Sequence, residues 1–464
     1  MSFTSTIFIF IFLPIALLLF GILKKLNVNN NIISAYILII SLSFFAWSGL
    51  SGLIVTLILT LINYLVGLRI SKSIHSKTWM IVGILLNTSV LVIYKYTNFI
   101  VNSIRSLMNL DAVLLPIPVA PLGLSFFTFM SIAYLADIYT KKIKALNNPL
   151  LFYEYALFFP KVSMGPITRV SALESDLKTH PSSWNKAYEG VIRFCTGFSK
   201  KILLSNQMAF MADQAFNSTV ALTPAYAWLG ILAYSLQIYL DFSAYSDMAI
   251  GLGNIFGITI IENFDYPYIS KSIKEFWRRW HISLSHWFRD YIYIPLGGNR
   301  NGKAATYRNL MIVFFLTGLW HGASWNFIVW GLFFGVFLLL ERAGLDKILE
   351  KLPAVLQHLY ALFVVMIGWV FFRADTLGNA LIYLKCMFGI TVGTMNNLNI
   401  LTEITPHFIF FLIISILACT PLFKKILHRF ESCWIRDFLI FAVFILALGY
   451  MVSSSYNPFI YTRF

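Results

Sequence analysis

The chain contains many apolar segments that are long enough to cross a membrane. A segment of about 17 to 25 residues with few charges can span the hydrocarbon core as a helix. Hydrophobic residues make up 58% of the 464 residues and charged residues only 12%, about half the charged share of a soluble domain. The apolar segments lie near residues 4–23, 32–50, 51–68, 79–94, 122–138, 190–210, 224–252, 309–340, 354–372, 407–422 and 437–453. The sequence therefore predicts an all-α polytopic membrane protein.

Glycine and proline interrupt several of these segments, so we expect about 11 to 13 transmembrane or re-entrant helices. The sequence lacks the strand alternation that a membrane β-barrel requires. It also lacks a fixed-period repeat and a low-complexity tract. We therefore expect residues 1–464 to form a single membrane domain. The four cysteines have no paired spacing, which indicates neither a disulfide framework nor a zinc site.

The distribution of basic residues predicts how the chain is oriented in the membrane. No basic residue precedes the first apolar segment, whereas Lys24 and Lys25 follow it directly, the reverse of a secretory signal peptide. By the positive-inside rule, the N-terminus faces outward and the basic loops at 69–77 and 141–144 face the cytoplasm. The net charge of +15 is then explained by cytoplasmic loops that meet anionic lipid, and we expect no nucleic-acid partner.

A histidine lies inside one of the longest apolar segments. Residues 319–326 read LWHGASWN and place His321 within the apolar stretch 311–340. An ionisable side chain at membrane depth is costly and is by default a candidate for function. The alternative, a histidine that only packs and forms hydrogen bonds in the interior, remains open from this observation alone.

A basic segment precedes this histidine. Residues 271–308 hold eight basic and two acidic side chains, a net charge of +6. At helical spacing Lys274, Arg278, His281, Ser285 and Arg289 fall on one stripe, opposite an aromatic stripe, which predicts one amphipathic helix at the cytoplasmic membrane face. The stripe has two interpretations. Its cations could anchor the helix to the membrane by contacting lipid phosphates, or they could line the entrance for a phosphate-bearing donor.

A metal site is the other chemistry that paired histidines suggest. His281 and His286 are five residues apart, so they do not share a helical face, and no nearby carboxylate completes a ligand set. We therefore expect no metal.

At these residues the chain resembles the membrane-bound O-acyltransferase family, in the bacterial branch that contains the alginate O-acetyltransferase membrane subunit. The similarity covers most of the chain, and together the motifs are highly specific. The matching segments are 121–129, 134–137, 159–161, 165–167, 237–247, 263–264, 266–268, 276–285, 295–300 and 320–322. Met130 departs from the pattern, because a glutamine is expected there, and any polar role of that position is in doubt.

The resemblance implies a ring of tilted helices around a thinned centre, with a tunnel that contains His321. His281 matches the second functional histidine of the family. The resemblance further implies a bacterial cytoplasmic (inner) membrane protein that binds no cofactor and uses acetyl-CoA as its donor substrate. The implied partners are a polysaccharide acceptor, membrane lipid and an extracytoplasmic acetyltransferase similar to the serine hydrolases.

Acyl transfer to an alcohol needs a base near the hydroxyl group and a donor for the developing oxyanion. A desolvated imidazole stays neutral at pH 7, as a base must, and we assign this role to His321, with His281 at the donor end of the path. The candidate substrate- and donor-binding residues are Arg278, Arg279, Ser285, Arg289, Trp320, Asn326, Tyr239 and Asp241. Ordinary helix packing is the alternative for Trp320.

Two other functions compete with acetyl transfer. D-alanyl transfer to teichoic acid belongs to a related branch, although the PLGGNR turn at 295–300 and the chain length favour the polysaccharide-acetylating branch. A proton-coupled transporter or flippase would use Asp241 and Asp247 as proton carriers, since carboxylates at membrane depth mark ion pathways. No inverted repeat with matched broken helices supports the transporter.

Overall fold

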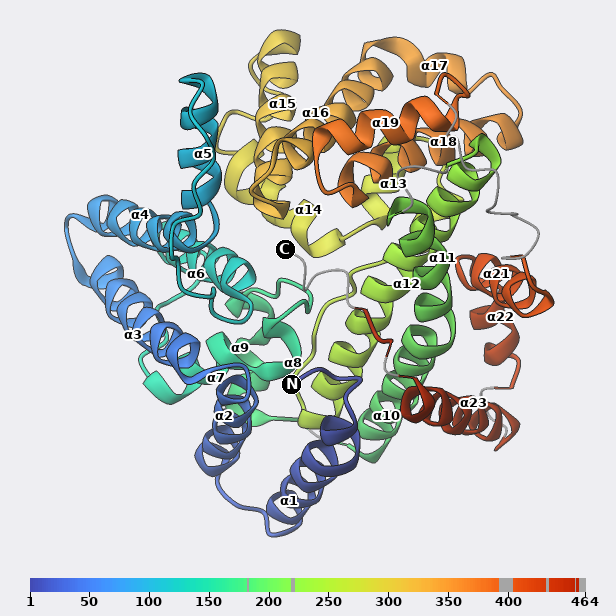
Figure 1. Cartoon of the computed structure of the whole chain (residues 1–464). Helices are drawn as coiled ribbons and strands as arrows, with labels where there is room; N and C mark the ends of the chain where they lie inside the picture. Colours follow the sequence, from blue (N-terminus) through green and yellow to red (C-terminus); the bar gives the residue numbers. More distant parts are fainter. Residues whose placement is uncertain (182, 218–221, 392–403, 431–433, 455, 459–464) are drawn as a thin grey trace. The chain divides into compact units, whose positions relative to one another are not determined.

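The computed structural model describes residues 1–181, 183–217, 222–391, 404–430, 434–454 and 456–458. Within these ranges all regular structure is helical, which confirms the all-α class (Figure 1). Six helices in the described ranges are long and apolar enough to cross a membrane, and the bent pair α21 (Pro406–Ala418) and α22 (Leu422–His428) would make a seventh span. The predicted number of 11 to 13 is not directly comparable with this count, because it also included shorter and re-entrant helices.

The chain forms two compact units. Two of their boundaries fall inside α10 (Trp184–Ser199) and α12 (Pro224–Phe256), and the third follows α12, between residues 261 and 262. The first unit contains residues 1–194 and 246–261, and the second contains 195–245 and 262–464. The prediction of a single domain remains a prediction.

The first unit contains both long apolar helices and short ones. Its complete helices are η1 (Phe8–Phe12), α1 (Leu13–Lys25), α2 (Asn30–Ala46), α3 (Leu50–Lys72), α4 (Ser76–Lys95), α5 (Thr97–Leu107), α6 (Leu124–Tyr139), α7 (Pro149–Leu157), α8 (Phe159–Val162) and α9 (Val170–Thr179). Helices α3 and α4 are joined by the buried Asn63 and Asn87, whose side-chain amides donate to each other at 3.0 and 2.8 Å. Such paired amides satisfy polar groups that lipid could not.

The second unit carries both predicted histidines. Its complete helices are η2 (Lys200–Ser205), α11 (Asn206–Asn217), η3 (Pro267–Ile269), α13 (Ile273–Arg279), α14 (Ile282–Phe288), η4 (Arg289–Tyr293), α15 (Gly302–His321), α16 (Trp325–Leu340), η5 (Glu341–Leu345), α17 (Asp346–Leu349), α18 (Ala354–Arg373), α19 (Leu377–Met387), α21, α22 and α23 (Trp434–Ser453).

Helices α15 and α16 form a closely packed hairpin in the second unit. A Cβ atom on Gly318 would lie 2.3 Å from the carbonyl oxygen of Phe327, and one on Gly331 would lie 2.2 Å from that of Phe314. Small residues at these two positions therefore let the helix backbones approach closely. The apolar segment 309–340 is thus two helices, separated by residues 322–324.

A buried ion pair joins η2 to α12. The Nζ atom of Lys201 lies 2.7 Å from Oδ1 of Asp241, and the two side chains are 0% and 1% exposed. The attraction between the two opposite charges offsets part of the free-energy cost of removing them from water. Asp241, predicted to bind substrate, is therefore held within the protein interior, and its role in substrate binding remains a prediction.

We expect Asp241→Ala to destabilise the fold, because it leaves the charge of Lys201 buried and unneutralised at a cost of about 3 to 5 kcal/mol. Thermal unfolding of the detergent-solubilised protein measures this loss. Replacing both residues together, Lys201→Met with Asp241→Leu, should recover much of the stability because neither charge is then buried. If Asp241→Ala alone kept wild-type stability, the pair would not stabilise the fold.

Candidate functional site

His321 is buried in an aromatic cage at the end of α15. The residue is 3% exposed to solvent. Its ring centroid lies 4.7 Å from that of Trp320, 4.8 Å from that of Trp330 and 5.1 Å from that of Phe372. The three rings come from α15, α16 and α18, so the hairpin and its neighbouring helix together remove His321 from water.

His281 lies in a sharp turn between two short helices. It is the N-cap residue of α14, directly after α13 and Trp280, and its φ angle is +44°. A non-glycine residue in the left-handed region is uncommon, although histidine is among the residues enriched there. Such strained residues persist where the surrounding structure fixes them and cluster at functional sites.

The turn corrects the predicted amphipathic helix. A continuous helix would place His281 on the exposed stripe with Lys274 and Arg278, whereas His281 is 0% exposed. The helix breaks because the backbone leaves the helical conformation at two residues: Trp280 is extended, with φ −96° and ψ 128°, and His281 is left-handed. Both side chains are buried. The prediction of one continuous helix through 274–289 was wrong.

The buried ring of His281 is neutral. Burial lowers its pKa from 6.5 to about 3, since desolvation disfavours the charged imidazolium. Its Nδ1 lies 3.1 Å from Oδ1 of Asn263, and its ring centroid lies 4.7 Å from that of Phe242. His281 is therefore available as a neutral ligand or base at physiological pH.

Trp320 brings the two predicted histidines into one cluster. Its ring centroid lies 6.2 Å from that of His281 and 4.7 Å from that of His321, and its side chain is 5% exposed. The histidines are 40 residues apart in the sequence, and both belong to the second unit. The sequence indicated a functional role for each histidine, and these roles remain predictions; their shared contact with Trp320 was not predicted.

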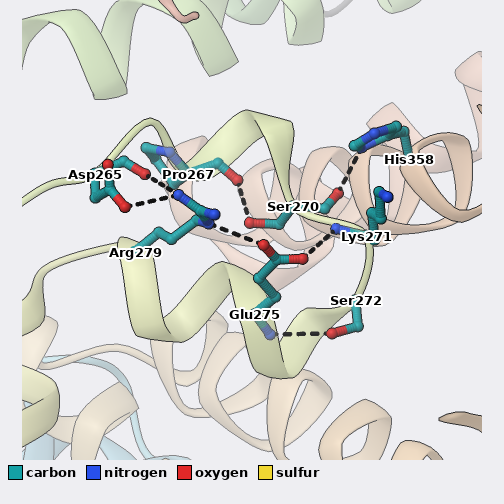
Figure 2. A network of polar contacts seen from close by, with 8 residues as sticks. All are labelled: Asp265, Pro267, Ser270, Lys271, Ser272, Glu275, Arg279 and His358. Atoms are coloured by element: carbon teal, nitrogen blue, oxygen red, sulfur yellow. Dashed lines mark hydrogen bonds and ion pairs between the residues drawn. The ribbon is translucent and has the colours of Figure 1, made fainter. Parts of the chain in front are cut away.

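A polar network fixes the segment that leads to His281 (Figure 2). Arg279 donates to Glu275 at 3.0 Å and to the carboxylate of Asp265 at 2.7 Å. Ser272 caps α13 by accepting the backbone N–H of Glu275 at 3.0 Å. His358 of α18 lies 3.1 Å from the carbonyl oxygen of Ser270, which ties the same segment to the neighbouring helix.

Glu341 supplies a second cap for α13 from the far end of α16. Its two carboxylate oxygens accept the backbone N–H groups of Ile273 at 2.6 Å and Lys274 at 2.9 Å, and Tyr360 donates to it at 3.2 Å. An anion at a helix N-terminus is stabilised by the helix dipole. Glu341 was not among the predicted residues, and its only signal in the sequence is an acid at the end of an apolar segment.

The predicted donor-binding residues lie in different environments. Arg278 is exposed, whereas Arg279 belongs to the network of Figure 2 and Arg289 pairs with Asp290 at 2.6 Å. Ser285 donates to the carbonyl oxygen of Trp277 at 3.3 Å. The structure thus gives Arg279 and Ser285 internal partners, and their roles in donor binding remain predictions.

Two further predicted residues stabilise the walls of the site. The side-chain amide of Asn326 donates to the carbonyl oxygens of Phe371 at 3.1 Å and Ala374 at 2.7 Å, and so closes the end of α18. Tyr239 packs against Phe264, with ring centroids 5.8 Å apart, in the wall behind His281. Both residues hold the cluster in place, and a direct contact of either with substrate remains a prediction.

Comparison with known proteins shows the family to which the chain belongs. The model of the membrane-bound O-acyltransferase family matches residues 140–373, a range that includes both histidines and the network around them. The chain belongs to the membrane-bound O-acyltransferase family. It is therefore an O-acyltransferase and a multi-pass bacterial membrane protein.

The relatives of this acyltransferase are similar over most of their length. It is 40% identical to the protein named "Probable alginate O-acetylase" of Azotobacter vinelandii, over 86% of this chain and 80% of the relative. The protein of that name in Pseudomonas putida is 36% identical over the whole of both chains. The peptidoglycan O-acetyltransferase of Helicobacter pylori is 33% identical, over 100% of this chain and 97% of the relative.

The different environments of two adjacent arginines predict different phenotypes. Arg278→Ala should weaken the use of a phosphate-bearing donor, by about 1 to 3 kcal/mol for a lost charged contact, and leave the melting temperature unchanged. Arg279→Ala should lower the melting temperature, because it frees Asp265 and Glu275. Donor KM in membrane vesicles and thermal unfolding separate the two effects. Equal losses of stability in both variants would contradict the assignment.

Proposed function

We propose that this acyltransferase moves an acetyl group from cytoplasmic acetyl-CoA across the membrane toward hydroxyl groups of an extracytoplasmic polysaccharide. An alginate-like exopolysaccharide, cellulose or peptidoglycan would be the acceptor. The observation that carries the proposal is the pair of buried histidines, His281 and His321, packed against the single ring of Trp320. The whole-length similarity to polysaccharide acetylases supports the acetyl group and the polymer.

His321 is the base in this proposal. It accepts the proton of the acceptor hydroxyl, and the oxygen attacks the carbonyl carbon of the thioester. The carbon–sulfur bond then breaks, and the coenzyme A sulfur leaves with the proton that His321 carried. Burial among Trp320, Trp330 and Phe372 keeps water from competing with the hydroxyl group.

An extracytoplasmic protein similar to the serine hydrolases completes the transfer to polysaccharide in this proposal. The donor side is the cytoplasm, where the exposed Arg278 and the other cations of 271–308 meet the phosphates of coenzyme A. The protein resides in the bacterial inner membrane with its N-terminus outward. Acetyl-CoA is a substrate here, and the proposal includes no bound cofactor.

D-alanyl transfer to teichoic acid is the alternative within the same family. It would use a carrier protein as donor in place of acetyl-CoA. The two donors are distinguished by supplying each to vesicles that contain the protein and measuring acyl transfer. Transfer that depends on an acyl-carrier protein and not on acetyl-CoA would replace the acetyl proposal by this alternative.

His321→Ala should abolish polymer acetylation. Removing a general base costs roughly 10² to 10⁴ in rate, so the acetyl content of the polymer in cells should fall to background. The exposed His75, on another part of the chain, offers a matched control, and His75→Ala should acetylate normally. Protein level is measured in parallel. Full acetylation by a stable His321→Ala protein would refute the mechanism, and aggregation of this variant would favour a packing role.

The proposed orientation is tested by cysteine labelling in intact cells. Asn301→Cys should resist a membrane-impermeant reagent, because segment 271–308 is expected to face the cytoplasm. Ser48→Cys lies in an exposed turn on the expected outer side and should react. Both positions should react after permeabilisation. Labelling of Asn301→Cys from outside would reverse the topology and move the donor to the other face.

A further inference from the structure

One oxygen atom organises the turn that holds His281. Oδ1 of Asn263 lies 3.1 Å from Nδ1 of His281, 3.2 Å from the backbone nitrogen of Ser283 and 2.9 Å from its hydroxyl group. Asn263 and His281 are both 0% exposed. The backbone oxygen of Asn263 also accepts the N–H of Ile282 at 2.9 Å. A residue 18 positions earlier in the chain therefore contacts His281 and both residues that follow it.

These bonds determine which nitrogen of His281 carries the proton. A backbone N–H can only donate, so the atom of Asn263 that receives the Ser283 N–H is the carbonyl oxygen and not the amide nitrogen. That oxygen can only accept, so Nδ1 of His281 must donate to it. In a neutral imidazole the other nitrogen then carries the lone pair. The arrangement therefore makes Nε2 the basic atom of His281.

The surrounding backbone holds this geometry against strain. His281 has a φ angle of +44°, a sparsely populated conformation for a non-glycine residue that needs support from its neighbours. The backbone N–H of Asp265 donates to the carbonyl oxygen of Arg279 at 3.0 Å, and Arg279 in turn donates to Asp265 (Figure 2). The segment 263–265 is thus bonded to the chain on both sides of His281.

We propose that Asn263 is a positioning residue for acyl transfer, which holds His281 in the Nδ1–H tautomer so that Nε2 accepts a hydrogen bond from an O–H or N–H group of the bound substrate. The proposal rests on the proposed participation of His281, and it holds for either acyl donor. The proton that leaves the acceptor hydroxyl still passes to His321. His281 orients the substrate through a hydrogen bond and forms or breaks no covalent bond.

The test measures acyl transfer by permeabilised membrane vesicles that contain the full chain, using labelled acetyl-CoA. Asn263→Ala removes the acceptor for Nδ1–H, so kcat should fall roughly 10- to 100-fold, the usual cost of losing the partner that orients a functional histidine. Ser283→Ala is the matched control. It removes one bond to the same oxygen and leaves the acceptor for His281 in place, so its kcat should fall by much less.

Asn263→Asp distinguishes a positioning role from a structural one. The carboxylate keeps an acceptor oxygen beside Nδ1–H, so kcat at alkaline pH should be restored relative to Asn263→Ala. The added negative charge favours the imidazolium and should raise the pKa of His281 by about 1 to 3 units. Because transfer needs Nε2 unprotonated, activity on the acidic side of the pH profile should be lost at a higher pH than in the wild type. A purely structural defect would lower activity equally at every pH.

The proposal is overturned if Asn263→Ala keeps a kcat near that of the wild type. It is also overturned if Asn263→Asp is as inactive as Asn263→Ala, or if it leaves the acidic limb unmoved. His281→Ala separates this failure from that of the proposed function. Normal transfer by a stable His281→Ala protein would exclude any part for His281, whereas loss of transfer in His281→Ala with normal transfer in Asn263→Ala would reject only the role of Asn263.

Discussion

Burial of two imidazole rings against Trp320 is the constraint on which the rest of the site depends. A charged imidazolium in such surroundings would have to give up its hydration, and for His281 burial lowers the pKa so that the neutral form is favoured. The cost of burying their polar nitrogens is offset only where hydrogen-bond partners are supplied. In the second unit, Asn263 is such a partner for His281. Close packing of α15 and α16 places His321 in the aromatic cage.

The supporting hydrogen bonds reach the site from distant parts of the chain. Glu341, at the end of α16, caps α13, and His358 of α18 binds the carbonyl group of Ser270. A short helix such as α13 has little intrinsic stability, so these external partners give it a fixed position. Rigid support of this kind is what a transferase requires, because small displacements of a reacting group are expensive in rate.

The buried pair of Lys201 and Asp241 bears on the competing transporter hypothesis. A proton carrier must exchange its proton with water on each side of the membrane, whereas Asp241 is 1% exposed and lies 2.7 Å from a buried cation. A carboxylate held in a buried ion pair suits packing better than proton exchange. Membership of the acyltransferase family agrees with this interpretation.

Residue patterns alone determined the all-α membrane class, whereas the contact of His281 and His321 with the same Trp320 ring was decided by the tertiary structure. The length of an apolar segment and the cost of an ionisable side chain at membrane depth are local properties of the chain. Both can be judged from the sequence without knowing which residues pack against the segment. Helical periodicity failed at 274–289, because the backbone is extended at Trp280 and left-handed at His281, where both side chains are buried. The roles of Asn263, Glu341 and Lys201 were decided only by tertiary structure. Each acts on a residue far away in sequence, and contacts of that range leave no periodic signal in the chain.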